Sequence, residues 1–181
     1  MALMESTMVP LGAPCPDFTL PGVDGRTWAR EDFREPALLV VVMCNHCPYV
    51  QAVDDRFNDM AGDYAGRCAV VGINPNDART HPEDSFEAMR ERAARKGYRF
   101  PYLRDESQEV ARAFGAVCTP DFFLYGPTRH LAYRGRLDDN WKDPAAVTRR
   151  DLRAALDALL GGRPLSEPQR PSMGCSIKWK S

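Results

Sequence analysis

The stretch ALLVVVMCNHC, residues 37–47, decides the fold, because a continuous apolar run ends in two cysteines that are two residues apart. A β-branched apolar run of this kind is typical of a central strand that is covered on both faces. Pro48 follows the second cysteine, and a helix tolerates proline only in its first turn. The sequence therefore predicts a strand over residues 38–43 that leads into a helix, with both cysteines at the helix amino terminus.

Alternating helices and strands follow this junction. Apolar residues recur at intervals of three and four from Val50 to Tyr64, which indicates an amphipathic helix. Turn signals within residues 13–36 indicate a small hairpin before the central strand. Further strands are predicted over residues 68–73, 100–103, 121–125 and 130–136, and further helices over residues 86–93, 110–114 and 147–159. With right-handed crossovers, this order gives an α/β sandwich with a central mixed β-sheet flanked by helices.

The length and composition indicate one domain. A chain of 181 residues with 44% hydrophobic content can bury a substantial core, and a second full domain would be cramped. We assign residues 1–162 to this domain. Residues 163–181 are rich in proline and serine and show no helical or strand period, so we expect an extended C-terminal tail.

Charge and hydropathy exclude several classes of partner. Basic residues number 24 and acidic residues 25, and the signs alternate, so we expect no nucleic-acid partner. The amino terminus lacks the features of a signal peptide, and no apolar run approaches the ~20 residues of a membrane helix. We therefore expect a cytoplasmic protein with no membrane partner. In that compartment six cysteines indicate catalytic, redox-sensing or metal-binding use more than a disulfide framework.

The helix amino terminus and His46 both favour a reactive thiol in this motif. Backbone amides and the helix dipole stabilise a thiolate there by ~0.3–2 kcal/mol. A protonated His46, placed between the cysteines, would lower the thiol pKa further. We expect Cys44, the outer cysteine, to be the nucleophile and Cys47, one turn in and more buried, to be the resolving thiol. The alternative for His46 is an exposed loop residue with no role.

Two other interpretations of the cysteine pair have less support. A structural zinc site needs a second close pair or a Cys/His cluster, whereas the remaining cysteines are isolated in the sequence. Unreactive core cysteines are common, but Asn45 and His46 suit an apolar interior poorly. We expect no metal and no cofactor.

Three stretches carry a resemblance to a known family. APCPDFTLPGVDGRTW (residues 13–28), VVVMCNHC (residues 40–47) and VCTPDFFLY (residues 117–125) resemble the thioredoxin superfamily, in its peroxiredoxin-like and thiol-disulfide reductase branch. The resemblance covers residues 13–160. The ending PSMGCSIKWK (residues 171–180) is similar to one that recurs in uncharacterised thioredoxin-like proteins.

The resemblance implies a site and a reaction. Cys44 and Cys47 match the redox pair of the family. Thr119 and Pro120 match the substrate-binding segment, in which a cis-proline faces the pair and guides a bound substrate backbone. A thiol-disulfide oxidoreductase would act on a protein or small-molecule disulfide and would need a dithiol electron donor.

The sequence departs from both branches of the family. Met43 stands where thioredoxins have tryptophan, and the strand before the pair lacks their buried acid. The proline and threonine that precede the reactive cysteine of peroxiredoxins are absent, although Arg134 or Arg136 could supply a charge. A thiol peroxidase and a non-catalytic redox-sensing switch therefore stay open as alternatives.

Two isolated cysteines bear on the mechanism. Cys118 precedes Pro120 by two residues and should lie near the pair, most simply as a packed thiol. Cys175 lies in the tail, thirteen residues after Gly162, a span that reaches ~45 Å when extended. Cys175 could act as a third redox thiol, or it could be an incidental cysteine in a tail anchored by Trp179.

Overall fold

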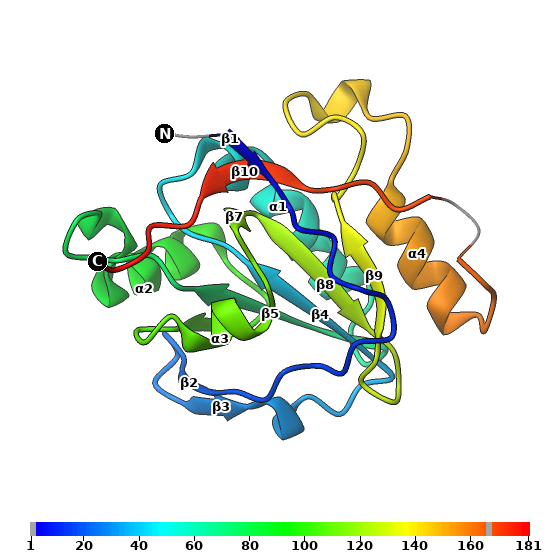
Figure 1. The fold of residues 1–181 in the computed structure, drawn as a ribbon, viewed down its shortest axis with the longest axis horizontal. Coiled ribbons are helices and arrows are strands. Elements are labelled where there is room, and N and C mark those ends of the chain that lie inside the picture. Colours follow the sequence, from blue (N-terminus) through cyan, green and yellow to red (C-terminus); the bar gives the residue numbers. More distant parts are fainter. Residues whose placement is uncertain (1–2, 166–167) are drawn as a thin grey trace.

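A mixed sheet forms the centre of the molecule. The computed structural model describes residues 3–165 and 168–181. The five strands of the sheet follow the order β6-β5-β4-β8-β9, and β4 pairs parallel with β5 and antiparallel with β8 (Figure 1). Their bounds are β4 (Ala37–Val42), β5 (Cys68–Asn74), β6 (Tyr102–Arg104), β8 (Asp121–Tyr125) and β9 (Leu131–Gly135). All six residues of β4 are buried, which confirms the predicted central strand.

Helices and a hairpin cover the two faces of this sheet. Leu39 and Val41 of β4 pack against α1 and α4, whereas Val40 and Val42 pack against α3 and the N-terminal hairpin. The helices are α1 (Pro48–Asp63), α2 (Phe86–Lys96), α3 (Glu109–Ala113) and α4 (Asp151–Leu160), with short 3-10 turns η1 (Arg30–Asp32), η2 (Pro82–Asp84) and η3 (Pro144–Ala146). The α/β sandwich and the hairpin, β2 (Thr19–Pro21) with β3 (Thr27–Ala29), match the prediction. The last helix begins at Asp151, later than predicted.

A second, smaller sheet includes one strand of the C-terminal tail. Strand β10 (Met173–Ser176) lies between β1 (Leu3–Glu5) and β7 (Cys118–Thr119) and is antiparallel to both. Figure 1 shows β1 and β10, the two ends of the chain, side by side across the molecule. The expectation of a tail without a strand was therefore wrong at these residues, because the backbone groups of β10 pair with those of β1 and β7.

Side chains beyond β10 hold the tail in place. Ile177 is buried in the core, and its backbone amide donates to the carbonyl of Val117 at 3.1 Å. The guanidinium of Arg112 lies over the ring of Trp179, 4.1 Å from its centroid. These contacts hold the tail on the C-terminal side of Cys175.

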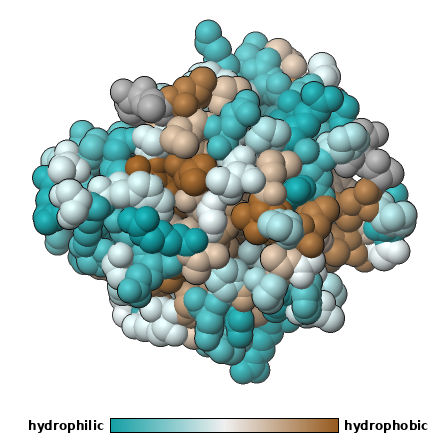
Figure 2. Space-filling model, viewed as in Figure 1, coloured by the Kyte–Doolittle hydropathy of each residue, from teal (hydrophilic) through white to brown (hydrophobic). Residues whose placement is uncertain are grey.

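The surface is mixed in character. Figure 2 shows apolar patches separated by hydrophilic side chains on the face crossed by β1 and β10. Within residues 3–165 and 168–181, no helix has both the length and the apolar character to cross a membrane.

Candidate redox site

The two cysteines of the motif lie at the junction of β4 and α1. Strand β4 ends at Val42, and α1 begins at Pro48, which occupies the first helical position as predicted. Cys47 is therefore the N-cap residue of α1. Both Cys44 and Cys47 are 0% exposed, so the expectation that Cys44 is the outer, accessible thiol is not met.

Three thiols and one threonine meet at this junction. The Cys44 Sγ lies 3.3 Å from the Thr119 Oγ1, and the Cys47 thiol lies 3.2 Å from the Thr119 carbonyl oxygen. The Cys47 Sγ is 2.9 Å from the Cys175 Sγ. The bond between Thr119 and Pro120 is cis, as the family resemblance implied. The structure thus brings together Cys44 and Cys47 of the β4–α1 junction, Thr119 of β7 (Cys118–Thr119) and Cys175 of β10.

The surroundings of the three thiols shift their pKa values in different directions. A hydrogen bond from Cys44, supported by Cys175 and by the backbone amide of Val50, outweighs burial and lowers the pKa of Cys47 to about 5. Burial raises the pKa of Cys44 well above its usual value, and the hydrogen bond to Cys47 adds to this effect. Burial likewise raises the pKa of Cys175 to about 12. The directions of these shifts make Cys47 the most acidic of the three thiols.

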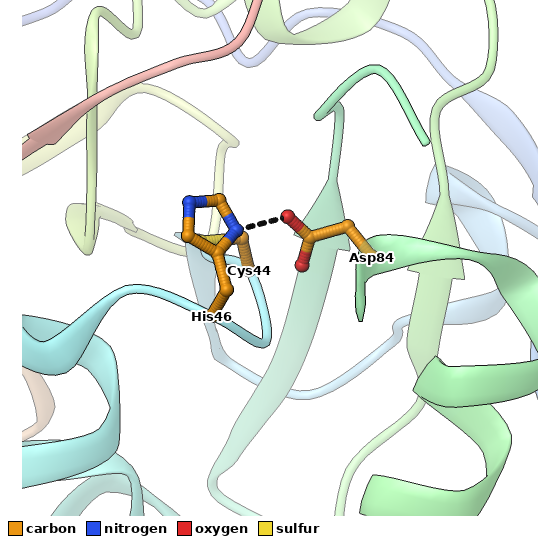
Figure 3. A group of neighbouring side chains, drawn as sticks. All are labelled: Cys44, His46 and Asp84. Atoms are coloured by element: carbon orange, nitrogen blue, oxygen red, sulfur yellow. Dashed lines mark hydrogen bonds and ion pairs between the residues drawn. The ribbon is translucent and has the colours of Figure 1, made fainter. Parts of the chain in front are cut away.

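His46 is held by a residue that the sequence did not reveal. Its Nδ1 lies 2.6 Å from the Oδ2 of Asp84, and Figure 3 shows the two side chains pointing toward each other beside Cys44. This hydrogen bond raises the pKa of His46 above its usual value, although burial opposes it. The ring of His81 stacks on that of His46 with centroids 4.7 Å apart. Asp84 lies 38 residues after His46, and nothing in the local pattern marks it as a partner of the motif.

A buried polar network surrounds Asp84. Its Oδ1 accepts hydrogen bonds from the Asn45 backbone amide at 2.6 Å and from the Asn74 Nδ2 at 3.3 Å. Its Oδ2 also accepts from the Asn76 Nδ2 at 2.8 Å. The hydroxyl of Tyr102 donates to the Asn45 Oδ1 at 3.0 Å. Asn45 and the Nδ1 of His46 therefore have hydrogen-bond partners in the interior, which removes most of the objection that the apolar core would reject the motif.

Cys44, His46 and Asp84 lie close enough to one another to ligate a metal ion. One ligand atom each from Cys44, His46 and Asp84 lies within 4.8 Å of the others. Both oxygens of Asp84, however, already accept the hydrogen bonds just described. We therefore assign these three side chains to hydrogen bonding.

Other candidates from the sequence lie apart from the thiols. Cys118 is fully buried, and burial raises its pKa; the nearest hydrogen-bond acceptor of its thiol is the Pro120 carbonyl oxygen at 4.0 Å. Arg134 donates to the Val9 carbonyl and to Gln169, and Arg136 pairs with Asp151. Neither arginine supplies a charge to the site.

Comparisons with known proteins agree with this architecture. Residues 11–134 match the model of the AhpC/TSA family. The chain belongs to the AhpC/TSA family. This assignment confirms the redoxin branch of the thioredoxin superfamily and indicates oxidoreductase chemistry in general terms. No curated protein matches the chain.

Several solved structures are similar to this chain. An uncharacterized conserved protein from Geobacillus kaustophilus is 48% identical with a TM-score of 0.95, over 99% of this chain and 97% of that one. A hypothetical protein from Sinorhizobium meliloti is 46% identical with a TM-score of 0.93, over 98% of each chain. A thiol-disulfide oxidoreductase from Bacteroides fragilis is 22% identical with a TM-score of 0.57, over 67% of this chain and 89% of that one, and shares the fold.

Proposed function

We propose that the protein is a thiol-disulfide oxidoreductase in which Cys47 is the attacking thiolate, and Cys44 and Cys175 are the thiols that resolve the intermediate. The observation that carries the proposal is the position of Cys47. It caps a helix, its pKa falls to about 5, and its sulfur lies 2.9 Å from that of Cys175. This reverses the roles that we expected for Cys44 and Cys47 from the sequence.

The reaction proceeds in two exchanges. The Cys47 thiolate attacks one sulfur of a substrate disulfide, forms a mixed disulfide with it and releases the other sulfur as a thiolate, which takes up a proton. Cys175 or Cys44, after losing its proton, then attacks the Cys47 sulfur and releases the second substrate thiolate. The substrate gains two electrons and the protein gains one disulfide. A dithiol donor restores the reduced protein.

The geometry favours Cys175 as the first resolving thiol. A disulfide needs a sulfur separation of ~2.05 Å, so only a small movement would join Cys47 to Cys175. Thr119 and Pro120 lie beside the reacting sulfurs and would contact a substrate, which we propose is a protein or small-molecule disulfide. We propose that the protein works in a reducing compartment, the cytoplasm. Cell fractionation checks the location.

A thiol peroxidase is the second candidate, and the AhpC/TSA match favours it. The Cys47 thiolate would attack a hydroperoxide oxygen, giving a sulfenic acid and an alkoxide or hydroxide. Cys175 or Cys44 would then condense with the sulfenic acid to give a disulfide and water. Among the described residues, no arginine is hydrogen-bonded to Cys44 or Cys47, which weakens this alternative.

Steady-state turnover tests these proposals. The reduced protein is supplied with dithiothreitol and either hydroxyethyl disulfide or hydrogen peroxide, and product thiol or remaining peroxide is measured. We expect disulfide turnover that Cys47→Ser abolishes and that Cys15→Ser, a buried cysteine outside the site, leaves intact. Faster turnover with peroxide would favour the peroxidase, and no turnover with either would leave the redox-sensing switch.

A further inference from the structure

Asp84 is a buried carboxylate that the reaction just described does not use. It is 0% exposed and lies at the end of η2, between β5 and α2. A charge in the interior is costly unless several donors satisfy it. Two of its donors, the Asn45 amide and His46, belong to the cysteine motif, and two, Asn74 and Asn76, lie at the end of β5 or just beyond it. The Asp84 carboxylate therefore links the cysteine motif to the end of β5 through hydrogen bonds.

The contact with Asp84 fixes the state of the His46 ring. A carboxylate only accepts hydrogen bonds, so the Nδ1 of His46 carries the proton that lies between them. The Nε2 of His46 is buried and has no hydrogen-bond partner among the residues that the structure describes. A histidine held in this way retains a proton at Nδ1, and a second proton at Nε2 would place a positive charge near Cys47.

Charged and titratable groups from every neighbouring element act on this centre. Lys178 of the tail opposes protonation of His46, whereas the Cys47 thiolate favours it. The Asp84 charge faces Cys44 and Tyr102 and raises the pKa of both. His81 stacks on His46, and Arg104 donates to the Asp84 carbonyl rather than to its carboxylate. Asp84 is thus a negative charge that faces both Cys44 and His46.

We propose that Asp84 is a positioning residue for the thiol chemistry, which decides that Cys47 rather than Cys44 carries the negative charge. It keeps the proton on Cys44, so that Cys44 donates to Cys47, and it holds the positive charge on His46. This inference rests on the proposed role of Cys47 as the attacking thiolate.

Asp84→Asn tests the proposal, because it keeps the size of the side chain and removes the charge. The reduced protein is treated with iodoacetamide between about pH 5 and 9, and mass spectrometry gives the alkylation rate of each cysteine. We expect the ratio of the Cys47 rate to the Cys44 rate at neutral pH to fall about tenfold, the change that a relative pKa shift of one unit produces. The pH midpoint of Cys47 should rise. In a His46→Ala background the substitution should change the ratio less, since the two residues act together.

A purely structural role would give a different result. Loosening of the motif or of the tail would raise both alkylation rates together and leave their ratio and the Cys47 midpoint unchanged, which would overturn the proposal. Asp105→Asn is the matched control: Asp105 is also 0% exposed, but it accepts from the Ala111 amide and Ser107, away from the thiols. We expect the control to leave the ratio unchanged.

A measurement on the unmodified protein keeps the proposal testable if Asp84→Asn does not fold. Nitrogen-15 NMR of the histidines reports which ring nitrogen of neutral His46 holds the proton. We expect the Nδ1-protonated form, and the Nε2-protonated form would refute the proposal. Neither this measurement nor the alkylation ratio requires turnover, so failure of the proposed enzymatic function is observed separately.

Discussion

The buried carboxyl group of Asp121 predicts how the stability of the protein changes with pH. It follows Pro120 as the first residue of β8, is 1% exposed, and neither carboxyl oxygen has a hydrogen-bond partner among the described residues. Burial raises the pKa of Asp121 well above its usual value, and the backbone amide of Phe122 offsets this only in part. The folded protein therefore holds this carboxyl protonated, whereas the unfolded chain ionises it above pH ~3.9.

The sign of the pH dependence follows from this difference. With the folded pKa raised, the contribution of Asp121 to stability is fully present below the unfolded pKa and is lost as pH rises toward the folded pKa. If the folded carboxyl stays protonated throughout, the loss between about pH 4.5 and 6.5 is roughly 2–3 kcal/mol, from 1.36 kcal/mol per pH unit corrected for partial ionisation at the lower pH. Asp121→Asn removes this loss, so the variant should gain roughly 2–3 kcal/mol relative to wild type across that range.

Urea unfolding of the reduced proteins at several pH values measures this gain. Burying the amide that replaces the carboxyl group has a cost that does not depend on pH. This cost shifts the free energy of unfolding of Asp121→Asn by the same amount at every pH, so it does not change the slope of stability against pH. Asp121→Val also lacks the ionisable group, so it should show the same slope with a different offset. A stability difference between wild type and both variants that does not change with pH would refute the assignment of a buried neutral acid.

Three further predictions concern the thiols. A Cβ at Gly174 would lie 1.9 Å from the Thr119 carbonyl oxygen, so Gly174→Ala should displace β10 and raise the alkylation rates of Cys47 and Cys175 about tenfold or more, with the thermal midpoint as a check on folding. Because the pKa of Cys47 is lowered to about 5, the disulfide exchange rate should hold steady from pH 7 to about pH 6 and fall as pH drops through about 5; a fall centred near pH 8.5 would contradict this. Peptide mapping of the oxidised protein should find the Cys47–Cys175 disulfide, and Cys175→Ser should shift all pairing to Cys44; exclusive pairing of Cys44 with Cys47 in wild type would remove Cys175 from the mechanism.

Local sequence features were sufficient to locate the centre of the fold. The apolar run before Cys44 can only be satisfied by burial on both faces, and it does form β4 in the middle of the sheet. Pro48 cannot donate a backbone hydrogen bond, and it begins α1 for that reason. These constraints act within a few residues of one another, so no knowledge of the remaining chain was needed.

Local sequence features could not predict the contacts between segments that lie far apart in the chain. Asp84 reaches the motif only because η2 follows β5 at the end of the sheet where β4 leads into α1, and the pairing of β10 with β7 joins segments more than fifty residues apart. Cys118 and Cys175 were equally isolated in the sequence, yet only Cys175 contacts Cys47. Adjacent residues on a strand point to opposite faces, so the contact of Thr119 with Cys44 turns Cys118 away from the thiols.

The proposed reversal of the two cysteine roles has one signal in the sequence, which is Pro48. Proline is favoured at the first helical residue, so Pro48 makes Cys47 the N-cap, and the amides of the first turn face the N-cap side chain. The Val50 amide accordingly helps to lower the pKa of Cys47. Cys44 lies three residues before this cap, beside the negative charge of Asp84, which raises its pKa. The hydrogen bond from Cys44 is the largest cause of the lowered Cys47 pKa, and the Val50 amide adds to it, so the statement that both cysteines lie at the helix amino terminus does not distinguish them.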